Sequence, residues 1–250
     1  MTGPDTLQPG RIALVTGASR GIGLAIADRL LAEGLKVIFA ARSEADLAAL
    51  SAERGAKALP LALDVADDRA VAALPESLPE GWRDVDVLVA NAGSDVGGRQ
   101  RFDQGQADDW TSTMEINVNG VIRVCHAVIP GMLARGRGHV VTLGSIAGLA
   151  TYGGGAIYAA SKHAVRAFTE GLRKDYKTDP IRITEILPGL VRSGFAEARY
   201  RGDRDKAAAF YDSFPAALEP DDIAAATLFA LGQPQHINIS QIVVTPTGDK

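Results

Sequence analysis

Cysteine is almost absent from this chain, which has one, Cys125, among 250 residues. An internal disulfide is therefore excluded, and a catalytic thiol would need a nearby base and partial exposure. Cys125 lies within the apolar run 121–129, so we interpret it as a small core residue. The four histidines show no metal-ligand spacing, and we expect no metal site.

An excess of positive charge is also missing. The net charge is −4, whereas a nucleic-acid-binding domain is usually basic, so we expect no nucleic-acid partner. A local positive pocket for an anionic ligand stays compatible with this balance. No run of about 18 apolar residues is visible, so we expect no membrane span. Residues 1–10 contain two prolines and no apolar stretch, unlike a signal peptide, and we expect a cytoplasmic protein.

Apolar runs alternate with helical patterns along the whole sequence. The runs are mostly continuously apolar, as in parallel strands that are covered on both faces. Strands are predicted at 11–15, 36–40, 57–63, 85–90, 139–143, 181–187 and 239–244, and helices at 21–33, 44–54, 110–133, 156–176 and 220–231. Without a linker, repeat or low-complexity segment, this order predicts one α/β domain over 1–250. The fold is a Rossmann-type, doubly wound, seven-stranded parallel sheet with helices on both faces.

The segment 194–214 breaks the alternation and is rich in arginine and aromatic residues. It follows the carboxyl end of a predicted strand, which is the edge where ligands bind to such sheets. We therefore predict that 194–214 is a substrate lid.

A glycine-rich turn joins the first strand to the first helix, with the sequence Thr16-Gly17-Ala18-Ser19-Arg20-Gly21-Ile22-Gly23. Glycines let the backbone approach a pyrophosphate, and the helix N-terminus that follows offers unpaired N–H groups. A tight connection without a ligand is the plainer interpretation, but the place of the turn at the first strand–helix junction favours a dinucleotide cofactor.

The spacing of this turn, TGxxxGxG, resembles that of the short-chain dehydrogenase/reductase family. Further motifs follow in the family's order over nearly the whole chain: Asn91-Ala92-Gly93, Asn117, Ser145, Tyr158-Ala-Ala-Ser-Lys162 and Pro188-Gly189. Two departures are mild, namely Ala90 before the Asn-Ala-Gly motif and Ser193 where the family often has threonine. The resemblance implies hydride transfer between a nicotinamide and an alcohol or carbonyl carbon.

The end of the second strand indicates which cofactor is bound. NAD-binding folds usually place an acid there for the ribose 2′-hydroxyl, but this chain has Ala41 followed by Arg42. Arg42 and Arg20 can grip a 2′-phosphate, although Arg42 alone would be read as a solvated loop residue. We therefore predict NADP(H).

Tyr158 and Lys162 are four residues apart and share one face of a predicted helix, a spacing that surface neighbours also show. Carbonyl reduction needs a proton donor, and we assign that part to Tyr158. Bringing a tyrosine pKa from near 10 to near 7 takes roughly 4 kcal/mol. One ammonium at about 4 Å, at an effective dielectric near 20, contributes on the order of 4 kcal/mol, so Lys162 can supply it, helped by the positive nicotinamide.

The resemblance implies the other roles. Ser145 would donate a hydrogen bond to the substrate oxygen, and Lys162 would bond the nicotinamide ribose. Asn117 would hold a water that links Lys162 to solvent. From the sequence alone, Asn119 could hold that water instead, and Asn117 could be a purely structural helix residue. Asp64 and Val65 would lie against the adenine, although Asp64 could equally be a strand-end cap. The implied cofactor contacts are Gly17, Ser19, Arg20, Gly21, Ile22, Gly23, Arg42, Asp64, Val65, Asn91, Ala92, Gly93, Tyr158, Lys162, Pro188, Gly189, Val191 and Ser193.

Several stretches resemble one branch of the family, the NADP-dependent 3-hydroxy acid (serine/allo-threonine) dehydrogenases. They are 128–132, 183–191, 195–203 and 234–239. The resemblance implies a small hydroxy acid, whose carboxylate needs a cation, and Arg192 and Arg199 are the candidates. A salt-bridged surface segment is the alternative interpretation.

Other functions stay open from the sequence alone. One is a 3-oxoacyl thioester reductase, another a general carbonyl or tailoring ketoreductase, and a third a non-catalytic NADP(H)-sensing protein. The family also implies a homotetramer, or a homodimer, in which the helices 110–133 and 156–176 pair and the final strand forms a second interface.

Overall fold

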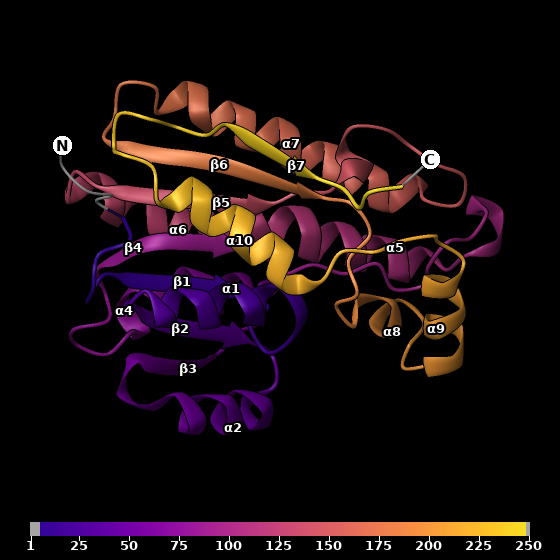
Figure 1. Cartoon of the computed structure of the whole chain (residues 1–250), viewed down its shortest axis with the longest axis horizontal. Helices are drawn as coiled ribbons and strands as arrows, with labels where there is room; N and C mark the ends of the chain where they lie inside the picture. Colours follow the sequence, from indigo (N-terminus) through magenta and orange to yellow (C-terminus); the bar gives the residue numbers. More distant parts are fainter. Residues whose placement is uncertain (1–5, 249–250) are drawn as a thin grey trace.

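A computed structural model describes residues 6–248, so the first five residues of the proline-containing segment 1–10 lie outside it. Seven parallel strands form one sheet in the order β3-β2-β1-β4-β5-β6-β7 (Figure 1). The strands are β1 (Ile12–Thr16), β2 (Lys36–Ala41), β3 (Ala58–Ala62), β4 (Val85–Ala90), β5 (Gly138–Leu143), β6 (Ile181–Pro188) and β7 (Gln241–Val244). The predicted doubly wound fold is confirmed.

Helices cover both faces of this sheet (Figure 1). One face carries α1 (Gly21–Ala32), α2 (Glu44–Arg54) and α10 (Pro220–Leu231). The other carries α3 (Asp68–Ala72), α4 (Leu74–Ser77), α6 (Gly120–Ala134) and α7 (Ala156–Asp175). In β1, Leu14 points to one core and Val15 to the other, and both are fully buried. This explains why the central strands read as continuous apolar runs.

The sheet edges differ from the centre. Strand β3 is half-exposed along its length, and β7 alternates between exposed and half-buried residues. Only one face of an edge strand is covered in this way. The predicted strands 57–63 and 239–244 correspond to these edges, and both extend beyond the observed β3 and β7. Their weaker apolar signal left the ends of both strands poorly marked.

The predicted helix 110–133 is interrupted in the structure. It consists of α5 (Ala107–Met114), a π-helical turn over Glu115–Asn119, and α6. A π-turn carries one more residue than an α-turn and often occurs at functional sites. It turns the side chains that follow it to a new face, which periodicity in the sequence could not reveal.

The continuous stretch Ala107–Ala134 is long and apolar enough to cross a membrane, with a mean hydropathy of 1.3 over 18 residues. No run of about 18 apolar residues is visible in the sequence, which predicts no membrane span, whereas this one stretch passes a test of length and composition. The indication is weak, because core helices of soluble proteins pass the same test. Val124, Val128 and Met132 of α6 belong to the core beneath the sheet. Cys125 is buried there too, and its burial raises the pKa of the thiol to about 12, in agreement with a structural role.

The carboxyl ends of β1 and β4 are bonded to each other where the strand order reverses. The Thr16 hydroxyl accepts hydrogen bonds from the backbone N–H groups of Asn91 and Ala92, each at 3.0 Å. The Asn91 side chain donates to the Thr16 carbonyl at 2.9 Å. Ligands of open α/β sheets bind at such a reversal, so these bonds fix the place of the site.

Candidate active site

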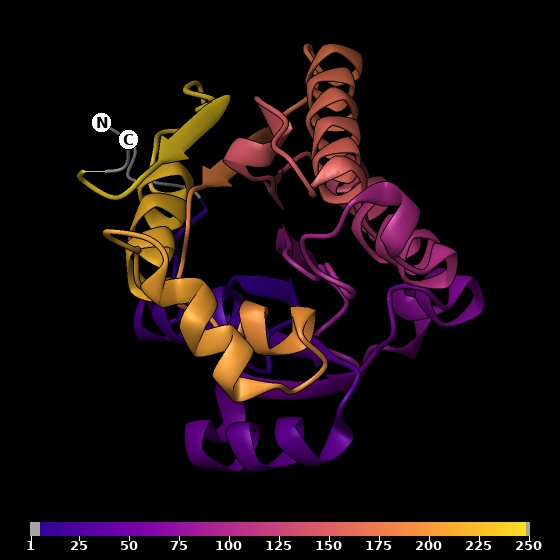
Figure 2. The same ribbon diagram turned by 90° about the vertical axis from the view of Figure 1, so that its right-hand side faces the viewer.

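A cavity of about 1110 Å³ opens at the carboxyl edge of the sheet. Figure 2 looks onto this edge, with α8 (Phe195–Arg199) and α9 (Arg204–Asp212) on one side and α5 on the other. Of the residues predicted to bind the cofactor, its wall contains Gly17, Ser19, Arg20, Gly21, Ile22, Arg42, Asp64, Val65, Asn91, Ala92, Gly93, Tyr158, Lys162, Pro188, Gly189, Val191 and Ser193. The two helices of 194–214 also line it, at the place predicted for a lid.

The glycine turn is packed so tightly that side chains are excluded from it. A Cβ on Gly23 would lie 2.4 Å from the Gly17 carbonyl oxygen, and one on Gly21, at a φ of +55°, would lie 2.5 Å from the Ser193 carbonyl. Gly23 is absent from the cavity wall, so its part is the close contact between helix and strand. The turn leaves the N-terminus of α1 facing the cavity, which suits a phosphate group.

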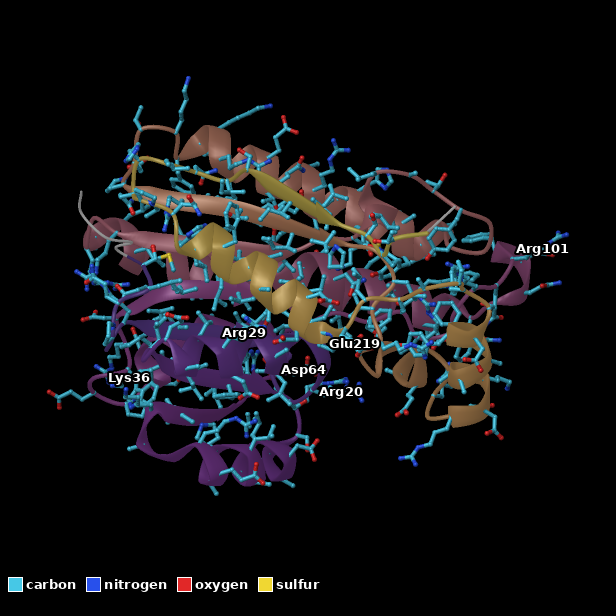
Figure 3. The ribbon with its side chains drawn as sticks, viewed as in Figure 1. Arg20, Arg29, Lys36, Asp64, Arg101 and Glu219 are labelled. Carbon is cyan, nitrogen blue, oxygen red and sulfur yellow. The ribbon has the colours of Figure 1, made fainter. Side chains whose placement is uncertain are left out.

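The cavity end near β2 carries two exposed arginines, Arg20 and Arg42. Figure 3 shows Arg20 and Asp64 at the same edge of the sheet. Ala41, the last residue of β2, is nearly buried and brings no carboxylate. Asp46, in the first turn of α2, also lines this end. Its backbone N–H donates to the Ser43 hydroxyl, which caps that helix. Asp64 lines this end as well, so the two guanidinium groups are not in excess over the acids. What favours a bound phosphate is the planar donor fork of Arg20 and Arg42 together with the missing acid at the end of β2.

Three of the four residues of the predicted catalytic set meet at the cavity. Ser145, Tyr158 and Lys162 line it, and the Ser145 side chain is close enough to the Tyr158 phenol to lower its pKa. The Lys162 ammonium donates to the Leu143 carbonyl oxygen at 2.8 Å. Lys162 and Tyr158 lie on α7, and Ser145 follows β5, so the two rigid elements fix the geometry.

The π-turn places the two candidate asparagines differently. Asn117 is buried, and its amide donates to the Ser94 carbonyl at 2.9 Å and to the Ser161 hydroxyl at 3.0 Å. Asn119 is exposed and bonds Glu115. Asn117 therefore lies behind the catalytic helix, where it connects the loop after β4 to α7.

Burial dominates the electrostatics of the two titratable groups. It lowers the pKa of Lys162 to about 8, against the opposing effects of the Glu185 and Asp95 charges. Burial also raises the pKa of Tyr158 above its ordinary value of 10.0. The Asp95 charge adds to this rise, and the Arg199 charge and the Ser145 hydrogen bond oppose it. Without the cofactor, the Lys162 ammonium does not bring this pKa near 7, because burial outweighs it; the expectation also counted on the positive nicotinamide.

Three charged residues that the sequence did not single out surround these groups. Asp95 forms an ion pair with Arg199 at 2.7 Å, and both side chains are at most 10% exposed. Glu185 on β6 is fully buried. Its Oε2 accepts a hydrogen bond from Gln241 at 2.7 Å, whereas its Oε1 has no partner among residues 6–248. Arg99, on the loop after β4, lines the cavity.

Of the two arginines predicted to meet a substrate carboxylate, only Arg199 lines the cavity. Arg192 is exposed, lies 5.2 Å from the Tyr211 ring centre and is absent from the cavity wall. Strand–helix patterns could not separate the two, because the backbone between them turns at Gly194, which has a φ of +72°.

Residues 11–204 match the family described as short chain dehydrogenase. The chain belongs to this family. It is 40% identical over 236 residues to an NADP-dependent 3-hydroxy acid dehydrogenase of Salmonella typhi, covering 94% of both chains. A protein of the same description from Schizosaccharomyces pombe is 37% identical over 244 residues, covering 95% of this chain and 93% of that one.

Solved structures agree with these likenesses. The closed form of a serine dehydrogenase complexed with NADP⁺ has a TM-score of 0.92 and 36% identity, with 96% of each chain covered. A second, a short-chain oxidoreductase in complex with NADP, has a TM-score of 0.80 and 30% identity, covering 96% of this chain and 99% of that one. The chain is therefore an oxidoreductase of the short-chain dehydrogenase type.

Because burial lowers the pKa of Lys162 from its ordinary 10.5 to about 8, a pH-dependent stability follows. The unfolded chain binds more protons between these values, so the wild type gains stability relative to Lys162→Met as pH rises from 8 to 10.5. The gain should reach up to about 3 kcal/mol. Urea unfolding of both proteins at pH 7 and pH 10.5 measures it. A difference that does not change with pH would show that Lys162 titrates normally.

Proposed function

We propose that this chain is an NADP(H)-dependent dehydrogenase that transfers a hydride between the nicotinamide and a small 3-hydroxy acid or its 3-oxo form. The observation that carries the proposal is the meeting of Ser145, Tyr158 and Lys162 in one cavity that also holds the glycine turn. Relatives named as 3-hydroxy acid dehydrogenases, matched over 94% of this chain, support the substrate class.

The residues present fit the cofactor. The turn at 16–23 excludes side chains from the place of a pyrophosphate, and Arg20 and Arg42 lie where a 2′-phosphate would be held. Asp64 and Val65 line the cavity near this end, and Pro188 and Gly189 line it beyond the catalytic residues. When bound, NADP⁺ takes up the hydride, and NADPH gives it.

The chain's own groups handle the proton. In oxidation, the C–H bond of the hydroxyl-bearing carbon breaks as the hydride leaves, the O–H proton passes to Tyr158, and the carbonyl double bond forms. Ser145, within hydrogen-bond distance of Tyr158, holds the substrate oxygen and stabilises its negative charge. The Lys162 ammonium favours the tyrosinate, and Asn117 fixes the loop and helix around it.

Removing the tyrosine hydroxyl tests this mechanism. Tyr158→Phe should lower kcat about 10²- to 10⁴-fold, because the proton loses its positioned acceptor. NADPH binding, followed by fluorescence, should change little, since Arg20 and Arg42 are untouched. Full turnover in the phenylalanine variant would refute the assignment of Tyr158.

The cofactor preference is tested at the end of β2. In Ala41→Asp, the new carboxylate would repel a 2′-phosphate and accept a hydrogen bond from a ribose 2′-hydroxyl. The ratio of kcat/KM for NADP⁺ to that for NAD⁺ should fall at least about tenfold. Ala41→Asn is the matched control with nearly the same shape and no charge. An unchanged ratio in the aspartate variant would contradict the NADP assignment.

We also propose that the chain assembles as a homotetramer. Large apolar side chains are exposed on two elements that the family resemblance pairs, Ile122 on α6 and Val243 on β7, the latter 52% exposed. Phe229 on α10 is 59% exposed as well. Burying them between copies would remove apolar surface from water. Light scattering after gel filtration should give four times the 26.2 kDa chain mass, and a monomer would reject the proposal.

A further inference from the structure

Three arginines line the cavity on its lid side: Arg99, Arg199 and Arg201. Two of them have their charge balanced by a carboxylate, Arg199 by Asp95 at 2.7 Å and Arg201 by Asp109 at 2.6 Å. Within residues 6–248, no ion pair involves Arg99. Of these three arginines, Arg99 therefore offers an incoming anion the charge that is least neutralised, although it also lowers the pKa of Asp95.

The pairing of Arg199 makes it a poor ligand for a substrate carboxylate. Its side chain is 6% exposed and lies against Asp95, whose own side chain is 10% exposed. A second carboxylate that approached the guanidinium would come close to that of Asp95, and the two negative charges would repel in a low-dielectric site. Breaking the pair instead would leave a buried charge uncompensated. Arg199 is thus suited to hold α8 against the loop after β4.

The backbone around Arg99 is tightly packed and contains glycines with positive φ. Gly97 and Gly98 precede it with φ values of +92° and +69°. A Cβ on Gly98 would lie 3.1 Å from Cγ of Arg199, so the turn packs directly on the lid. On the other side, a Cβ on Gly154 would lie 3.2 Å from the Arg99 carbonyl carbon. The Arg199 side chain on one side and Gly154 on the other therefore fix the backbone at Arg99, whose side chain is exposed and lines the cavity.

Aromatic rings hold the guanidinium of Arg99. Its Cζ lies 4.4 Å from the ring centre of Tyr152 and 5.4 Å from those of Phe210 and Phe214. Rings that stack on a guanidinium leave the N–H groups at its edge free to bind a carboxylate in two-point fashion. They also reduce the side-chain freedom that binding would otherwise remove.

Contacts between rings and guanidinium groups continue from Arg99 to Tyr158. Arg199 lies 4.7 Å from the Phe210 ring centre and 5.4 Å from that of Phe195. The Phe195 ring is in turn 5.8 Å from the ring of Tyr158. The alternating aromatic and guanidinium groups form one wall, with Tyr158 at one end and Arg99 at the other.

We propose that Arg99 binds the carboxylate of the substrate and so selects hydroxy acids over neutral alcohols. The inference rests on the proposed function and gives Arg99 the part that the sequence suggested for Arg192 or Arg199. The ligand is a carboxylate on a short chain, whose hydroxyl-bearing carbon lies at Tyr158 while the acid group reaches the mouth of the cavity.

The test compares an acid with its ester. Arg99→Gln should raise KM about 10- to 100-fold for a 3-hydroxy acid that the wild type oxidises, since a charge-assisted pair is lost. Its kcat should stay within about threefold, because Arg99 lies away from the reacting atoms. KM for the methyl ester of the same acid should not change. A loss that is equal for acid and ester would overturn the proposal.

Two variants serve as controls. Arg201→Gln removes another arginine of the same wall, one that is ion-paired and exposed, and the acid-to-ester ratio should not move. Arg199→Gln should lower the melting temperature and impair acid and ester together. If Arg199→Gln instead loses only the acid while Arg99→Gln keeps it, the carboxylate belongs at Arg199 and the proposal is wrong.

A separate measurement keeps the inference independent of the substrate class. In the wild type, butyrate should compete with a neutral ketone during NADPH-dependent reduction, and Arg99→Gln should lose this inhibition. A wild type that is inhibited by butyrate but oxidises no 3-hydroxy acid would reject the proposed function and uphold the carboxylate site. Inhibition that persists unchanged in Arg99→Gln would overturn the site.

Discussion

The buried ammonium of Lys162 is the constraint on which the rest of the site depends. A lysine that is 7% exposed, with its Nζ bonded to the Leu143 carbonyl, stays charged near neutral pH only if nearby charges offset its burial. Two carboxylates do so, Glu185 from β6 and Asp95 from the loop after β4. The strand β6, the loop after β4 and the helix α7 must therefore be packed together before this ammonium can carry its charge.

Those two carboxylates are themselves buried, and each needs its own compensation. Asp95 obtains it from Arg199 on α8, whereas Glu185 faces the Arg166 and Arg173 charges of α7 as well as Lys162. Burial still raises the pKa of both acids. The site is thus an array of mutually dependent charges, in which removing one leaves its neighbour desolvated and unpaired.

The charges around Lys162 do not lower the pKa of Tyr158 below its ordinary value. Burial and Asp95 raise the pKa of Tyr158, and the Ser145 hydrogen bond and Arg199 offset this only in part. A positive nicotinamide beside the phenol would act in the same direction as Arg199. Proton uptake by Tyr158 is therefore coupled to the oxidised form of the cofactor, and the phenol stays neutral in its absence.

Much of this fold was predictable, because strands covered on both faces leave continuous apolar runs and helix caps punctuate them. The meeting of Tyr158 and Lys162 with the glycine turn at one cavity was predictable too, since the two residues are a turn apart on α7 and the turn has a specific spacing. The π-turn at 115–119 was not, because one extra residue in a turn leaves no trace in composition. Nor was the Asp95–Arg199 pair, whose partners are brought together only by the tertiary fold.

Different parts of the fold face the two ends of a substrate. The groups that handle the proton lie on α7 and at the end of β5, which are rigid elements fixed by the core. The groups that face the rest of the substrate lie on the loop after β4 and on α8 and α9. Loops tolerate substitution better than the elements they connect. A change at Phe210 would reshape this wall without removing a charge from the array around Lys162. Arg99, in contrast, also lowers the pKa of Asp95. Similarity in the rigid elements therefore indicates the reaction more firmly than it indicates the substrate.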